Sequence, residues 1–101
     1  MVTCHIRYEI DPAKLPEFET YARLWLPLVA KFGGQHHGYF LPHEGKNYEA
    51  FAAFSFESMA AYEAYREKMA ADEDCQAAFE YARKTDCIVR IERQFMRPVL
   101  G

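Results

Sequence analysis

The stretch over residues 31–56 restricts the fold of this chain more than any other segment. It begins where a helical pattern ends at Gly33-Gly34, and glycine just past the last turn is typical of a helix terminus. Residues 35–41 then form a strand pattern with histidines and aromatic side chains, and residues 48–56 form a second, mostly apolar one. The polar residues 42–47 between them are typical of a turn. The stretch therefore predicts a β-hairpin that directly follows a helix.

Strand patterns also open and close the chain. Residues 2–10 alternate strictly between apolar and polar side chains, and residues 87–96 form the last strand, with Val89, Ile91 and Phe95 expected to face the helices. Helical patterns begin at Asp11-Pro12, at Ser58 and at Asp72 or Asp74. The resulting order is β-α-β-β-α-α-β. It predicts an α+β fold over residues 1–101, a ferredoxin-like split βαβ sandwich with one four-stranded antiparallel sheet, and the first and last strands as neighbours in its centre.

Composition excludes several classes of protein. The formal net charge is −3 without a cluster of Lys and Arg, so we expect no nucleic-acid partner. No apolar run approaches the roughly 20 residues of a membrane helix, and the N-terminus lacks a signal-peptide pattern. The three cysteines are not closely spaced, which favours reduced thiols and a cytoplasmic location.

The predicted sheet needs cover on both faces, and its own helices can cover only one. The other face would carry a mixture of charged and aromatic side chains, namely His5, Arg7, Glu9, Phe51, Arg90 and Glu92. Such a mixture suits a polar-cored interface, so we expect a homodimer that associates sheet to sheet. The alternative is a face whose charges are simply solvated.

The helix-covered side has more large rings than a small core requires. Candidates for a ligand cleft are Tyr21 and Trp25 on the first helix, Tyr62 on the second, and His36, His37 and Tyr39 on the second strand. Adjacent strand residues point to opposite faces, so only one of the two histidines faces the cleft, and the sequence leaves open which one. That histidine would be a polar group titrating near neutrality. The alternative is an aromatic core without a ligand.

The chain resembles the NIPSNAP family, small proteins of the dimeric α/β-barrel superfamily. The resemblance extends over nearly the whole chain and depends on the order of several short motifs: Arg7-Tyr8, Asp11-Pro12, Leu15-Pro16-Glu17-Phe18, Gly33-Gly34, Gly38-Tyr39-Phe40, Glu44-Gly45, Asn47, the segment from Asp72 to Phe79, and Arg97-Pro98. It implies a dimer whose two sheets form a barrel, with a cleft between helices and sheet in each subunit. The superfamily includes cofactor-independent monooxygenases, haem-degrading enzymes, isomerases and proteins without known activity.

Two functions follow as expectations. The first is binding of a small aromatic or lipophilic ligand, with cofactor-independent oxygenation or isomerisation as the reaction type, His36 or His37 as base, and Tyr39 or Arg7 as hydrogen-bond donor. The second is a non-enzymatic protein-interaction module. We expect no metal, because the adjacent His36 and His37 cannot jointly hold an ion without a bulge, and a site that combines one of them with His5 has no obvious carboxylate or cysteine partner. We expect no cofactor either, because none of the histidines lies on a predicted helix, where haem-binding relatives place theirs.

Overall fold

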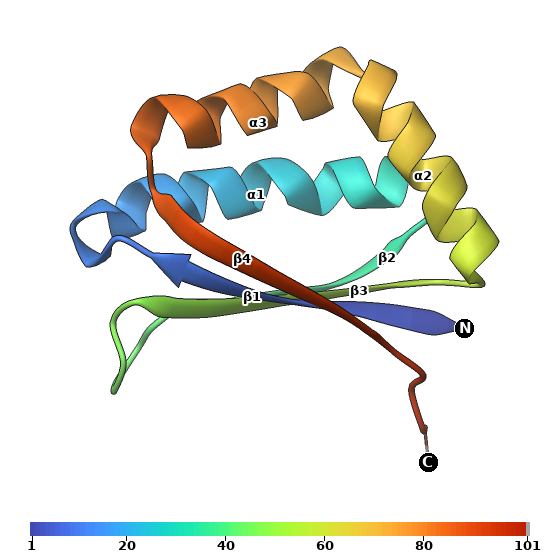
Figure 1. Cartoon of the computed structure of the whole chain (residues 1–101), viewed down its shortest axis with the longest axis horizontal. Helices are drawn as coiled ribbons and strands as arrows, with labels where there is room; N and C mark the ends of the chain where they lie inside the picture. The colour runs from blue at the N-terminus through green and yellow to red at the C-terminus, as the bar shows by residue number, and fades with distance from the viewer. Residues whose placement is uncertain (101) are drawn as a thin grey trace.

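The chain folds into a four-stranded antiparallel sheet with three helices on one face (Figure 1). The structure is a computed structural model and describes residues 1–100. Its elements in chain order are β1 (Val2–Ile10), the 3-10 turn η1 (Pro12–Lys14), α1 (Leu15–Lys31), β2 (Gln35–Phe40), β3 (Glu49–Phe56), α2 (Met59–Ala71), α3 (Glu73–Thr85) and β4 (Ile88–Met96). The expected element order and ferredoxin-like α+β class are confirmed.

The strand order is β2-β3-β1-β4, so β1 and β3 form the centre of the sheet. The last strand does pair with β1, but the expectation that it lies in the sheet centre is wrong. Strand β1 uses one edge to pair with β3 and the other to pair with β4, and no further strand pairs with β4. Strand β4 is therefore an edge strand with free backbone groups on its outer side.

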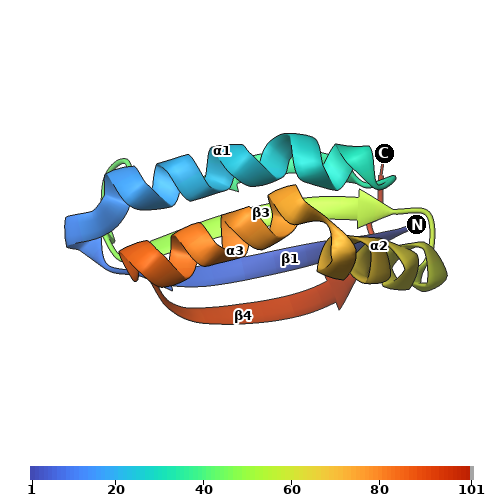
Figure 2. The same ribbon diagram turned by 90° about the horizontal axis from the view of Figure 1, so that it is seen from above.

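The core lies between the sheet and the helices. On β1 the alternation predicted from sequence is present, with Cys4, Ile6, Tyr8 and Ile10 buried under the helices. Helix α1 covers them with a stripe at helical spacing: Phe18, Tyr21, Ala22, Trp25, Leu28 and Val29. In the view from above, α1 and α3 run over the sheet, whereas no helix lies over the middle of β4 (Figure 2).

Helix α1 begins and ends at defined side chains. Asp11 caps the η1 turn, because its Oδ1 accepts a hydrogen bond from the Ala13 backbone N–H at 3.0 Å, and the α-helix itself starts only at Leu15. At the other end a Cβ on Gly34 would lie 2.6 Å from Val29 Cγ1 and 2.8 Å from Phe56 Cζ. Only glycine lets the chain pass this close to the core before β2 begins.

Asp72 connects the three helices. Its Oδ2 accepts a hydrogen bond from the Cys75 backbone N–H at 3.0 Å, so Asp72 rather than Asp74 caps α3. Its Oδ1 accepts a hydrogen bond from Lys31 Nζ at the end of α1, at 2.9 Å. Cys75 itself is fully buried, and burial together with Asp72 raises the pKa of its thiol to about 11, so it is not a reactive cysteine.

At the start of β4, one side chain does not point to the side of the sheet that the sequence predicts. The pairing register shifts between Glu9↔Arg90 and Ile10↔Ile88, which leaves Val89 as the extra residue of a β-bulge. Val89 is 62% exposed, and the expectation that it faces the helices is wrong. Within residues 1–100, none of the helices is both long and apolar enough to cross a lipid bilayer.

Candidate functional site

A small cleft lies between the helices and the helix-facing side of the sheet. It has a volume of about 60 Å³, and all three helices and all four strands contribute to its wall. We call it the aromatic cleft and define it by its lining residues: Ile6, Tyr8, Tyr21, Trp25, Val29, Tyr39, Phe54, Tyr62, Tyr65, Met69, Phe79 and Arg93. The sequence-predicted residues Tyr21, Trp25, Tyr39 and Tyr62 are thus brought together here.

The rings of the aromatic cleft pack mainly edge to face. Trp25 contacts Tyr21 at a centroid distance of 6.2 Å and Phe79 at 4.9 Å, in each case as a T-shaped pair. Tyr8 stacks on Tyr39 at 6.0 Å. Such pairs hold large rings in fixed orientations.

A β-bulge in β2 determines on which face of the sheet each of the two adjacent histidines lies. His36 pairs with Phe54, and the next pair is Gly38 with Ala53, so His37 is the extra residue. The bulge places both His36 and Tyr39 on the helix-facing side, where their rings stack at 5.0 Å. His37 lies on the other face, with Nε2 2.7 Å from Ser55 Oγ.

Regular alternation along β2 predicts that the face of the sheet without helices carries either His36 and Phe40 or His37 and Tyr39. Both alternatives are wrong, since the face without helices carries His37 and Phe40. The signal that sequence reasoning missed is Gly38, whose φ of +107° lets the chain make the bulge. His36 does not itself line the aromatic cleft but stands behind Tyr39.

His36 is a neutral hydrogen-bond donor. Its Nδ1 accepts a hydrogen bond from the Gly38 backbone N–H at 2.9 Å, which assigns the proton to Nε2, and that buried atom has no partner. Burial, assisted by the neighbouring His37, lowers the pKa of His36 to about 4. The expectation of a group titrating near neutrality is therefore wrong. A histidine base in the cleft is also wrong, because the one lone pair of His36 is occupied and His37 faces away.

The tyrosines of the cleft are protonated at neutral pH. Burial raises the pKa of Tyr21 to about 12, against the opposing effects of Trp25 and Tyr8. Burial also raises the pKa values of Tyr39 and Tyr65 further still, and that of Tyr8 well above its usual value, where Tyr39 and Tyr21 add to the effect. These four hydroxyls therefore keep their protons, as does that of the fifth cleft tyrosine, Tyr62, whose pKa is also raised by burial.

Arg93 is the lining residue that sequence reasoning missed. It lies opposite Ile6 in the β1–β4 pairing and so shares the helix-facing side with Ile91 and Phe95. Its charge lowers the pKa values of Tyr62 and Cys4 against the dominant effect of burial, which places it close to both groups. The signal was present in the sequence, because Glu92 was assigned to the face without helices and Arg93 is the next residue in the strand.

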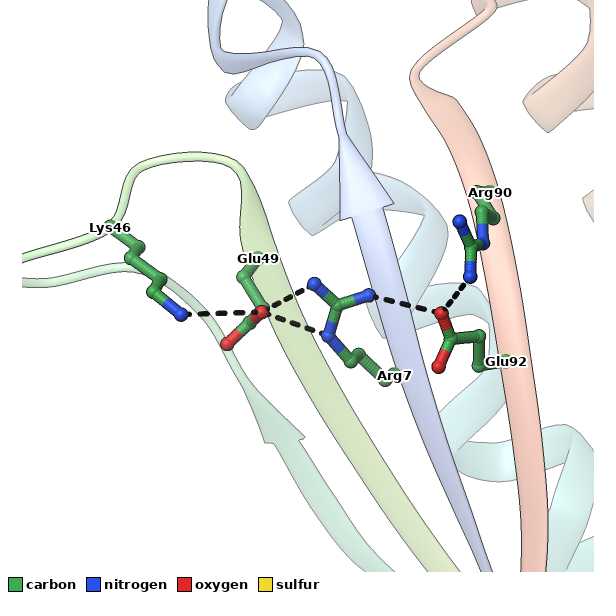
Figure 3. A network of polar contacts seen from close by, with 5 residues as sticks. All are labelled: Arg7, Lys46, Glu49, Arg90 and Glu92. Carbon is green, nitrogen blue, oxygen red and sulfur yellow. Dashed lines mark hydrogen bonds and ion pairs between the residues drawn. The ribbon is translucent and has the colours of Figure 1, made fainter.

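The face of the sheet without helices, which we call the open face, carries a chain of ion pairs across three strands (Figure 3). Arg7 on β1 lies 2.6 Å from Glu49 on β3 and 3.4 Å from Glu92 on β4. Lys46 extends the chain beyond Glu49 at 3.9 Å, and Arg90 contacts Glu92. Glu49 is the member that sequence reasoning missed, although it has the same strand parity as Phe51.

The sequence-predicted interface residues all lie on the open face, as the β1 pairings with β3 and β4 show. His5, Arg7, Phe51 and Glu92 border a hollow of about 360 Å³ there, and Arg93 and Ile6 reach its edge. Glu9 and Arg90 are directly opposite each other in the register, yet Glu9 makes no ion pair with any of residues 1–100. Phe51 is 45% exposed and Phe40 is 61% exposed on this face.

Comparison with known proteins identifies relatives of this chain. A sequence model of the NIPSNAP family matches residues 5–100, whereas no curated protein matches significantly. A NIPSNAP family protein of unknown function from Agrobacterium tumefaciens has a TM-score of 0.83 at 20% identity, over 97% of this chain and 87% of that one. An uncharacterised NIPSNAP domain protein from Burkholderia xenovorans has a TM-score of 0.80 at 23% identity, over 98% and 95%. A Nitrosomonas europaea protein provisionally described as an antibiotic biosynthesis monooxygenase has a TM-score of 0.76 at 8% identity, over 99% and 100%.

Proposed function

We propose, from the premise that this chain belongs to the NIPSNAP family, that it is a homodimer binding a small aromatic or lipophilic molecule in the aromatic cleft of each subunit. The observation that carries the proposal is Trp25. Its side chain is almost fully buried, and its indole Nε1 makes no hydrogen bond of normal geometry, although the Tyr21 hydroxyl is close enough for Trp25 to lower its pKa. Trp25 also lines the aromatic cleft. Buried donors are normally paired, and an unpaired one at a cavity indicates a missing partner.

The space for a ligand includes a groove beside the cleft. At about 60 Å³ the cleft alone is smaller than the 300–1,000 Å³ typical of ligand pockets. A groove of about 280 Å³ between α3 and β4 shares Tyr21 and Phe79 with it and continues over Ala82 and Ile91. A ligand of one ring and a short chain would therefore lie across both.

The open face supports the homodimer. It exposes Phe40 and Phe51 beside a chain of charges of alternating sign, which a second copy related by a two-fold axis would match. Burial of this face by a second sheet would reach the roughly 1,200–2,000 Å² of a stable interface. The three free, buried cysteines support a reducing compartment, which we take to be the cytoplasm.

Cofactor-independent oxygenation or isomerisation would face a specific constraint at this site. A proton must leave the substrate, but the cleft has no carboxylate, its tyrosines hold their protons, and His36 has no free lone pair. Catalysis here would start from a substrate that is already ionised in solution, with the hydroxyls and Arg93 stabilising its charge.

A protein-interaction module is the second candidate. It is favoured by the apolar residues exposed at the end of the chain, where Met96, Val99 and Leu100 are 46%, 85% and 79% exposed. This candidate predicts that filling the cleft leaves the biological phenotype unchanged, whereas polar replacements at these three residues abolish it.

The lone tryptophan makes ligand binding measurable. Trp25 is the only tryptophan in the chain, so its fluorescence reports on the cleft alone. We expect 3-phenylpropanoate or 3-phenylpropanamide to change that fluorescence with a saturable dependence on concentration. Ala82→Phe, which fills the groove, should abolish the change, and Ala77→Phe on the outer side of the same helix should not. Failure of both compounds, and of 3-phenylpropylammonium, with the wild-type protein would reject the ligand-binding proposal.

A further inference from the structure

The aromatic cleft carries positive charge and no negative charge. Among its lining residues only Arg93 is ionised at neutral pH, and no Asp or Glu is present. The other two arginines of β1 and β4, Arg7 and Arg90, lie on the open face and form ion pairs with glutamates there. Within residues 1–100 Arg93 has no carboxylate within 4.0 Å, although Glu92 precedes it in sequence. The cleft therefore has, at its solvent-exposed edge, a cation whose counter-charge is not supplied by the described part of the chain.

The neutral polar groups of the cleft can all donate a hydrogen bond, although the tyrosine hydroxyls can also accept one. Trp25 Nε1–H can only donate, and it has no partner. The hydroxyls of Tyr8, Tyr21 and Tyr39 are protonated and close enough to influence one another's ionisation. An incoming ammonium group would find no anion here, whereas an oxygen anion would find a guanidinium, an indole N–H and several O–H groups.

We infer that the ligand carries a carboxylate, which enters the aromatic cleft beside Arg93 and Trp25, while its aryl part occupies the groove between α3 and β4. This inference rests on the proposed function and adds the chemical class of the ligand. The cleft volume of about 60 Å³ suits a polar head of a few heavy atoms, and the groove has the apolar side chains Phe79, Ile88 and Ile91 for a ring. The groove also carries Arg83 and Asp86, one charge of each sign, so it does not select for ligand charge.

Three compounds of one shape and different charge test the inference. They are 3-phenylpropanoate, 3-phenylpropanamide and 3-phenylpropylammonium, each titrated against the fluorescence of Trp25 in the full-length protein at pH 7. A charged hydrogen bond contributes roughly 1.5–3 kcal/mol, so the carboxylate should bind about ten- to a hundredfold more tightly than the amide. The ammonium compound should bind more weakly than the amide.

Arg93→Gln provides the second comparison. It should weaken binding of the carboxylate about tenfold or more and leave the affinity of the amide nearly unchanged. Arg97→Gln, which removes the same charge four residues further on at an exposed position, is the control and should affect neither compound. Sedimentation of both variants shows whether their association state matches the wild type.

The outcomes separate the two proposals. If the amide binds as tightly as the carboxylate, or Arg93→Gln and Arg97→Gln behave alike, the carboxylate inference is wrong and the ligand-binding proposal stands. If the ammonium compound binds most tightly, the inference is also wrong. If none of the three compounds changes the fluorescence of Trp25, the ligand-binding proposal falls and the inference falls with it.

Discussion

His36 stacks on Tyr39 with ring centroids 5.0 Å apart, although the two residues are three positions apart in one strand and regular pleating would separate them onto opposite faces. The bulge at His37 brings them together. It buries one histidine behind the cleft wall, and it directs the other to the open face. Two adjacent histidines thus lie in different surroundings, one on each face of β2.

The burial of His36 predicts a specific dependence of stability on pH. Because its pKa in the fold is lowered to about 4, from 6.5, the unfolded chain takes up a proton first as the pH falls. The stabilisation is fully present above pH 6.5 and is lost progressively toward pH 4, by about 1 kcal/mol or more after discounting for partial exposure.

Urea unfolding at pH 7 and pH 5 measures this effect. The difference in unfolding free energy between the two pH values should be smaller in His36→Gln than in the wild type, and His43→Gln, at an exposed turn position, should match the wild type. An NMR titration that gives His36 a pKa near 6.5 would contradict the assigned burial.

Gly34→Ala tests the close approach of the chain to the core. The added Cβ would lie 2.6 Å from Val29 Cγ1, so overpacking should lower the free energy of unfolding by about 1–3 kcal/mol. Val29→Ala removes the obstructing methyl groups, and the effect of Gly34→Ala in that background should be smaller. Additive effects of the two changes would show that the contact is relieved elsewhere.

Much of this architecture could be predicted from the sequence. The alternation of β1, the stripe of α1 and the caps at Ser58 and Asp72 are local signals, and local chemistry determines them. The position of β4 at the sheet edge could not be predicted in this way, since it depends on which edge of β1 each partner uses.

The candidate site was predictable only in part. The aromatic residues of the cleft follow from helical spacing, but the facing of His36 depends on one extra residue in β2, and a bulge leaves little trace in the sequence apart from Gly38. The facing of Arg93 follows from simple alternation, because its neighbours Glu92 and Gln94 both lie on the open face. The partnering of Arg7 with Glu49 depends on the β1–β3 register, which the sequence does not determine.

The ion-pair network on the open face predicts that removing one of its largely buried charges lowers stability more than removing an unpaired surface charge. Glu49 is only 14% exposed, accepts a hydrogen bond from Arg7 and forms an ion pair with Lys46, so Glu49→Gln should lower the midpoint of urea unfolding. Glu67→Gln on the exposed side of α2 removes the same charge without an ion pair among the described residues and is the control. Equal midpoints for the two variants would show that the network contributes nothing to stability.

Phe51→Lys tests the homodimer. A lysine at this position would be desolvated in a sheet-to-sheet interface without a partner, which should weaken association roughly a hundredfold or more. Leu24→Lys is the matched control, since Leu24 is 39% exposed on the outer side of α1 and Phe51 is 45% exposed. Sedimentation at micromolar concentration should show a dimer for the wild type and Leu24→Lys, and a monomer for Phe51→Lys. A monomeric wild type would contradict the proposed assembly.

The indole N–H resonance of Trp25 tests the ligand-binding cleft most directly. The chain has one tryptophan, so a nitrogen–proton correlation spectrum contains one such signal, from a donor that lacks a partner in the structure. Titration with 3-phenylpropanoate should move this signal downfield and saturate, as the N–H gains an acceptor. A signal that stays in place at saturating compound, while surface amides move, would show that the cleft does not bind it.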